Sequence, residues 1–128
     1  MEKDNMKSYT DLKQAKKLAE FLPTESADMC FCPINYGNPN VLCETAETHE
    51  PWTYDHPCWS LAALRRILPW IININNDSYV FTSHNTIDKT WVYMYINQKD
   101  QTAIYQSELN EVDACYEVIL KLKELEII

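Results

Sequence analysis

The run from Trp91 to Ile96, WVYMYI, constrains the fold more than any other part of the chain. Its β-branched and aromatic residues predict a strand, and successive side chains of a strand point to opposite faces of its sheet. Because both sets of alternating positions are apolar, both faces of this strand need cover. We therefore expect a central strand with helices on one face and, on the other, aromatic packing or a partner such as a second copy.

Further β-rich runs are separated from this strand by short turns. With residues 90–97, the runs at 79–83 and 101–107 predict a three-stranded antiparallel meander. A short apolar run at 29–34, bounded by helix and strand breakers, predicts another strand, and Pro33 places that strand at a sheet edge.

Apolar residues at helical spacing predict three helices, over residues 9–22, 57–68 and 110–126. Ser8 or Thr10 can cap the first helix and Asn110 the last, while Pro57 suits the first position of the middle one. The middle helix is apolar on nearly all sides, so we expect it to be the most deeply buried. These elements predict an α+β fold in which the meander packs with the three helices.

The chain length and a region without periodicity bear on domain organisation. The 128 residues fall within the usual size of one domain, so residues 1–128 are predicted to form a single domain. Residues 35–55 carry prolines, asparagines and acidic residues without apolar periodicity, which predicts a long loop. This loop is either a functional segment or an exposed insertion.

Charge and composition narrow the classes of partner. Nineteen acidic and eleven basic residues give a net charge of −8, which repels phosphate backbones and disfavours DNA or RNA as a partner. Gly37 is the only glycine, so a glycine-rich phosphate-binding loop is excluded and no cofactor is expected. Abundant tyrosines and tryptophans favour protein partners wherever they face solvent.

Hydropathy and cysteine usage indicate the compartment. The longest uncharged apolar run, residues 67–72, is far shorter than a membrane-spanning helix, and the polar N-terminus lacks the apolar core of a secretory signal. Five cysteines, an odd number, do not suggest a complete disulfide framework. We therefore expect a cytoplasmic protein without a membrane partner.

The segment HPCW at 56–59 suggests a possible thiol site. It places Cys58 at the start of the predicted middle helix, where the helix dipole favours a thiolate. Cys58 followed by His84, and then by Asn85 or Asp88, has the chain order of a papain-like nucleophile, base and orienting residue. No glycine lies near Cys58 to open the backbone for substrate, and His84 falls in a predicted turn. A packing role for Cys58 is therefore favoured over catalysis.

A second group of residues has the chemistry of a zinc site. Thiols and imidazoles that could bind a tetrahedral zinc ion are supplied by Cys30, Cys32, Cys43, His49, His56 and Cys58. Cys30 and Cys32 point the same way in an extended segment, which is usable geometry. No Cys-x-x-Cys pair is present to pre-form the site, so a structural zinc domain is kept only as an alternative.

Three strings along the chain resemble one family: Ala27-Asp28-Met29, then Pro57-Cys58-Trp59-Ser60-Leu61 running to Leu68-Pro69, then Asp113-Ala114-Cys115-Tyr116-Glu117. The chain resembles small uncharacterised proteins of gut Bacteroidales and their prophages. The resemblance spans most of the chain, from the first predicted helix to the last, and implies an accessory product of a phage or mobile element, but no known activity and no functional residue.

These observations predict a non-enzymatic accessory protein that acts through protein contacts, possible partners including a second copy of itself. The first alternative is a cysteine-dependent hydrolase or transferase that uses Cys58 and His84. The second is a small structural zinc-binding domain.

Overall fold

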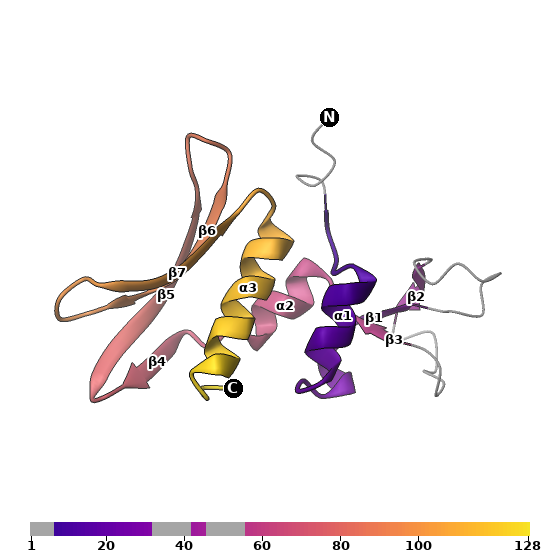
Figure 1. Cartoon of the computed structure of the whole chain (residues 1–128), viewed down its shortest axis with the longest axis horizontal. Helices are drawn as coiled ribbons and strands as arrows, with labels where there is room; N and C mark the ends of the chain where they lie inside the picture. The colour runs from indigo at the N-terminus through magenta and orange to yellow at the C-terminus, as the bar shows by residue number, and fades with distance from the viewer. Residues whose placement is uncertain (1–6, 32–41, 46–55) are drawn as a thin grey trace. The chain divides into compact units, whose positions relative to one another are not determined.

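The computed structural model describes residues 7–31, 42–45 and 56–128, which belong to two compact units (Figure 1). The N-terminal unit is Ser8–Arg65, and the C-terminal unit is Met1–Lys7 with Arg66–Ile128. Helices and antiparallel sheets make the fold α+β, as the sequence predicts. The assignment of residues 1–128 to a single domain stays a prediction.

The N-terminal unit begins with helix α1, Leu12–Ala19. Asp11 caps it: the Asp11 carboxylate accepts a 2.8 Å hydrogen bond from the backbone N–H of Gln14, and the Gln14 side chain accepts one from the backbone of Asp11. The predicted caps, Ser8 and Thr10, are therefore wrong. They lie in an extended segment where Thr10 N–H donates to Trp59 O at 3.0 Å, and this pairing delays the helix.

A short 3₁₀ turn, η2 (Thr24–Ser26), leads into a three-stranded antiparallel sheet with the order β2-β1-β3. Its strands are β1 (Met29–Phe31), β2 (Leu42–Thr45) and β3 (His56–Cys58). The predicted edge strand, β1, is thus the central strand. The described strand covers Met29–Phe31, and Pro33, on which the edge prediction relied, lies outside the described residues.

Two more sequence predictions are corrected in this unit. β2 is a strand inside the predicted loop, while the remaining residues of 35–55 lie outside the described part of the chain. The predicted helix over 57–68 is helix α2, Leu61–Ile67, because Cys58 and Pro57 pair with β1 instead. Ser60 opens α2, and its hydroxyl oxygen accepts a 3.2 Å hydrogen bond from Ala63 N–H.

The C-terminal unit contains a four-stranded antiparallel meander with the order β4-β5-β6-β7. Its strands are β4 (Ile71–Ile74), β5 (Asp77–Asn85), β6 (Trp91–Asn97) and β7 (Ala103–Glu108). The three predicted strands correspond to β5, β6 and β7, and β4 is an addition. Asn75 and Asn76, both at positive φ, form the two-residue turn that joins β4 to β5.

Helix α3, Glu111–Glu124, packs on this sheet along β6 and β7 (Figure 1). Asn110 caps it as predicted, its side chain accepting a 2.8 Å hydrogen bond from Asp113 N–H. The fully buried side of α3 carries Val112, Ala114, Cys115, Val118, Ile119 and Leu122. Among the predicted helices it is α3 that lies wholly in the unit of the meander, while α1 belongs to the N-terminal unit.

Candidate interaction surface

Cys58, the predicted nucleophile, lies in strand β3 and not at a helix N-terminus. It is fully buried, and its thiol lies 3.5 Å from the carbonyl oxygen of Thr10, to which it donates. Burial raises the pKa of the Cys58 thiol to about 11, and the nearby carboxylate of Asp28 adds to the rise, while a hydrogen bond with Thr10 opposes it. A buried, protonated thiol favours the packing role over nucleophilic chemistry.

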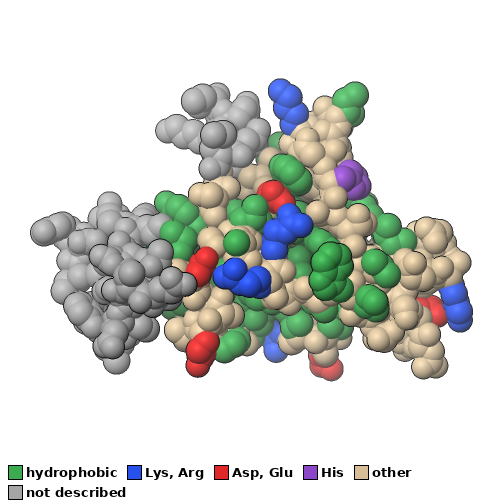
Figure 2. All heavy atoms as spheres, turned by 180° about the vertical axis from the view of Figure 1, so that it is seen from behind, with side chains coloured by type: hydrophobic (Ala, Val, Ile, Leu, Met, Phe, Trp, Pro, Cys, Tyr) green, Lys and Arg blue, Asp and Glu red, His purple; other side chains and the backbone are tan. Residues whose placement is uncertain are grey.

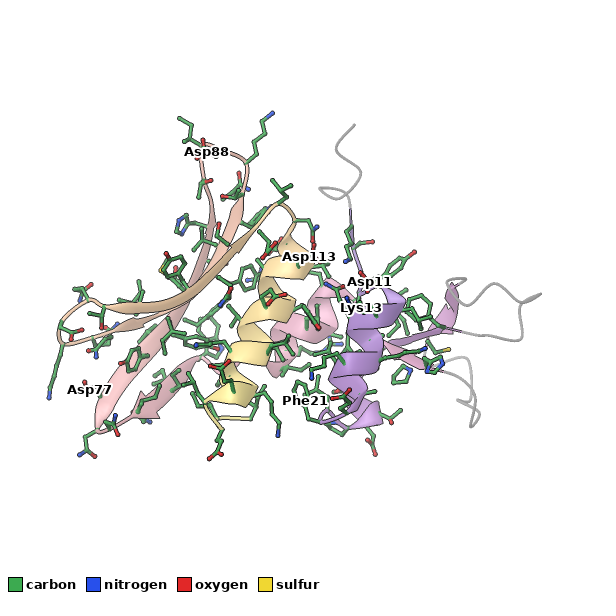
Figure 3. All side chains as sticks on the ribbon, in the orientation of Figure 1. Asp11, Lys13, Phe21, Asp77, Asp88 and Asp113 are labelled. Atoms are coloured by element: carbon green, nitrogen blue, oxygen red, sulfur yellow. The ribbon has the colours of Figure 1, made fainter. Side chains whose placement is uncertain are left out.

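The other members of the predicted thiol site belong to the C-terminal unit. His84 and Asn85 are exposed at the end of β5, and Asp88 lies at the tip of the β5–β6 hairpin (Figure 3). Cys58 belongs to the N-terminal unit. Neither compact unit therefore contains all the members of the predicted thiol site.

The described members of the predicted zinc group lie on different faces of their sheet. His56 on β3 is directly opposite Phe31 on β1, so the neighbouring Cys30 points to the other face. Cys32 and His49 lie outside the described residues, and Cys43 lies in β2. Within the described part of the chain, no three His, Cys, Asp or Glu side chains form a group that could hold a metal ion.

Two of the three sequence strings on which the predicted resemblance rests meet in the N-terminal unit. The Asp28 carboxylate accepts hydrogen bonds from Ser60 N–H at 2.9 Å and from the Ser60 hydroxyl at 2.5 Å. The indole N–H of the adjacent, fully buried Trp59 donates to the Ser26 hydroxyl at 2.9 Å. These contacts hold the first turn of α2 against the turn before β1, which gives both strings a structural role.

The strand register of the C-terminal unit separates two different faces of the meander. On the face toward α3, which we call the closed face, Tyr93 and Tyr95 are fully buried. The Tyr93 hydroxyl donates to the Glu111 carboxylate of α3, and the Tyr95 hydroxyl donates to the carbonyl of Pro69 at 2.7 Å. The hydroxyl groups of Tyr93 and Tyr95 are therefore both hydrogen-bonded within the folded chain.

The opposite face, which we call the open face, consists of three rows of directly paired residues. The first row crosses all four strands and the other two cross β5, β6 and β7; in order they are Ile71-Val80-Ile96-Ala103, Thr82-Met94-Tyr105 and His84-Val92-Ser107. Directly paired residues share a face and lie about 5 Å apart, so each row is contiguous.

The open face combines exposure with an absence of formal charge. Tyr105 is 60% exposed and Ile71 56%, while Val80, Met94 and Ile96 are half-buried and Val92 is buried. None of the ten residues is Asp, Glu, Lys or Arg, although the chain has 19 acidic and 11 basic residues. Figure 2 shows hydrophobic side chains reaching the surface between charged ones on the side that it draws. Large exposed apolar patches mark interaction sites.

Part of the open face can be recognised from the alternation of side chains along a strand. In β7 the open-face positions Ala103, Tyr105 and Ser107 are exposed and the residues between them are half-buried, the pattern of a strand covered on one side. The two apolar faces of Trp91–Ile96 predict aromatic packing or a partner on the second face of this strand. Ile71 was not predicted as part of the surface, because β4 was not predicted.

No protein-family model, no curated protein and no solved structure matches this chain. Among the described residues, no helix has the length and apolar character that crossing a membrane requires.

Proposed function

We propose that this chain is a non-enzymatic protein-interaction module whose binding surface is the open face of the meander. The observation that carries the proposal is the ten-residue uncharged surface that includes the exposed side chains of Tyr105 and Ile71. Covering such a surface removes apolar area from water, which is worth about 25 cal/mol per Å² before the costs of association. A protein partner supplies that cover.

The chemistry of the candidate catalytic residue supports a binding role over an enzymatic one. Cys58 is fully buried and its pKa is raised to about 11, so little thiolate forms near neutral pH. The net charge of −8 works against phosphate-rich partners. A protein surface is therefore the partner class that this chain suits best.

The biological setting that we propose follows from the family resemblance. Asp28 and Ser60, which belong to two of the resembling strings, bind each other and stabilise the N-terminal unit. A resemblance that implies no functional residue, carried by strings with a structural role, suits an accessory protein of a phage or mobile element that acts in the cytoplasm by binding another protein. The open face would then be the part that acts.

Site-specific photo-cross-linking in cells that naturally carry the gene tests this proposal. A benzophenone amino acid replaces Tyr105 on the open face or, as the control, Ile87, which is 96% exposed at the tip of the β5–β6 hairpin and outside the open face. We expect a discrete protein adduct from position 105 and none from position 87. Equal yields at the two positions, or no adduct at 105, would contradict the proposed function.

A further inference from the structure

We infer that the occupant of the open face is a second copy of this chain, packed sheet against sheet about a two-fold axis. This inference rests on the proposed function, because it names the partner of the same surface. A symmetric dimer needs a patch that is complementary to itself. The open face meets that requirement in charge and in shape.

The charge distribution favours self-association on this face. Each copy carries a net charge of −8, so most ways of bringing two copies together place acidic side chains near one another. The three rows of the open face contain no carboxylate and no ammonium or guanidinium group, so two copies meet there without like-charge contact. A strongly basic partner, by contrast, would find no acidic side chain on these rows to pair with.

The shape of the face also suits a copy of itself. Antiparallel sheets are twisted, and two sheets pack face to face, about 10 Å apart, when their twists match at roughly 30°. A second copy has the same twist by symmetry. A two-fold axis parallel to the sheet and beneath its centre brings the middle row of one copy onto the middle row of the other. Thr82 and Met94 then form the centre of the interface.

The area of the open face fits a weak dimer. Each of its ten residues occupies about 33 Å² of the sheet plane, because strands lie about 4.8 Å apart and successive residues on one face lie about 6.8 Å apart. Each copy therefore contributes about 330 Å² in projection, or about 650 Å² for the pair before side-chain relief is counted. That area is below the roughly 1,200 Å² of stable specific interfaces, so we expect a weak dimer that forms at high protein concentration.

Sedimentation equilibrium of the purified full chain, from about 1 to 500 µM, tests the inference directly. We expect the mass to rise from 15.0 kDa toward twice that value. Ile71→Asp and Tyr105→Asp each place a charge in the interface from an exposed position, so both should fold normally and raise the Kd at least about 30-fold. Ile87→Asp removes an even more exposed apolar side chain outside the face and should leave the Kd unchanged.

The two Asp variants separate face packing from pairing of edge strands. Tyr105 lies on the edge strand β7, and Ile71 lies on β4 at the other edge of the sheet. Loss of dimer in both variants supports face packing, whereas loss in Tyr105→Asp alone indicates pairing through β7 and overturns it. Thermal unfolding of each variant verifies that the fold is intact.

A wild-type chain that stays at 15.0 kDa throughout the concentration range overturns the second copy as occupant. The proposed function is decided separately, by the adduct from position 105. An adduct that contains only a different protein sustains the interaction module and rejects the dimer. Absence of both the adduct and the dimer rejects both proposals.

Discussion

The two faces of the meander differ although the same strands build them. Along β6, Tyr93 and Tyr95 on the closed face are fully buried, while Met94 and Ile96 on the open face are half-buried. All four positions are apolar or aromatic. The difference therefore arises from the cover that α3 provides and not from residue type, and it separates the side chains that stabilise the unit from those available to a partner.

The closed face also fixes the orientation of its aromatic rings. Phe81 packs against Tyr93 and Tyr95 with ring centroids 5.5 and 5.4 Å apart, in edge-to-face and tilted arrangements. The open face has the exposed Tyr105 in the row of Thr82 and Met94. Substitutions on the closed face should thus change the stability of the fold, and those on the open face should change association.

Truncation of one tyrosine on each face gives the largest expected contrast. Tyr95→Ala leaves a cavity under α3 and removes the hydrogen bond to Pro69, so we expect it to lower the free energy of unfolding by about 3–5 kcal/mol. Tyr105→Ala, on the neighbouring strand, should lower it by no more than about 0.5 kcal/mol in the monomer. Urea unfolding at a protein concentration well below the Kd measures both values.

Equal losses in the two variants would mean that the open face contributes to the core of the folded monomer. The division between a stabilising face and a binding face would then fail. Circular dichroism of Tyr95→Ala distinguishes a destabilised fold from one that never forms.

Alkaline pH gives a second contrast, expected to be smaller. Burial, with a minor contribution from Cys115, raises the pKa of Tyr95 far above the ordinary value of 10.0. The unfolded chain then loses this proton at a lower pH than the folded chain does, so stability falls as the pH rises above 10.0. The slope from this one group is at most about 1.4 kcal/mol per pH unit, reduced by solvent screening.

Tyr95→Phe isolates that contribution. It lacks the hydroxyl bonded to Pro69, so we expect a loss of about 1 kcal/mol at pH 7 and a shallower decline above pH 10 than in the wild type. Urea unfolding at pH 7, 10 and 11 measures the difference. Parallel curves for the two proteins would show that Tyr95 ionises as readily in the folded chain as in the unfolded one.

Local patterns predicted the regular parts of the fold and failed where long-range pairing competes with them. The β-rich runs and the Asn110 cap were sufficient to place β5, β6, β7 and α3. Pro57 and Cys58 instead form β3, because pairing with β1 outweighs the helical pattern. β4 was missed because residues 73–77 look like one long turn, whereas only Asn75 and Asn76 form it.

The candidate site was predictable in part, because one of its strands has a clear local pattern. The two apolar faces of Trp91–Ile96 indicated that the strand is central, and β6 does lie between β5 and β7. Which face of the sheet α3 covers depends on the direction in which the chain turns between β7 and α3, and the local pattern of no single segment contains that information. The thiol hypothesis relied on a helix start at Pro57, and it loses that support once β3 occupies the position.

The smallest predicted effect is the change in stability caused by ionisation of a carboxylate on α3. It compares the charged groups near α3 with the uncharged open face. Partial burial raises the pKa of Glu117, and the carboxylates of Glu108 and Asp113 raise it further. A group with a raised folded pKa binds its proton more tightly in the folded chain. Its ionisation therefore lowers stability as the pH rises from the ordinary value of 4.5 through the folded pKa.

Glu117→Gln removes that ionisation, and Glu126→Gln removes one negative charge from an exposed position near the end of the chain as the control. We expect Glu117→Gln to raise the free energy of unfolding at pH 7 by up to about 0.5 kcal/mol, with the gain disappearing below pH 4 because both states are then protonated. Thermal unfolding between pH 3 and pH 7 measures this. An equal gain in Glu126→Gln would mean that the effect comes from the net charge of −8. It would then not come from the carboxylates of Glu108 and Asp113 near Glu117, which have no counterpart on the open face.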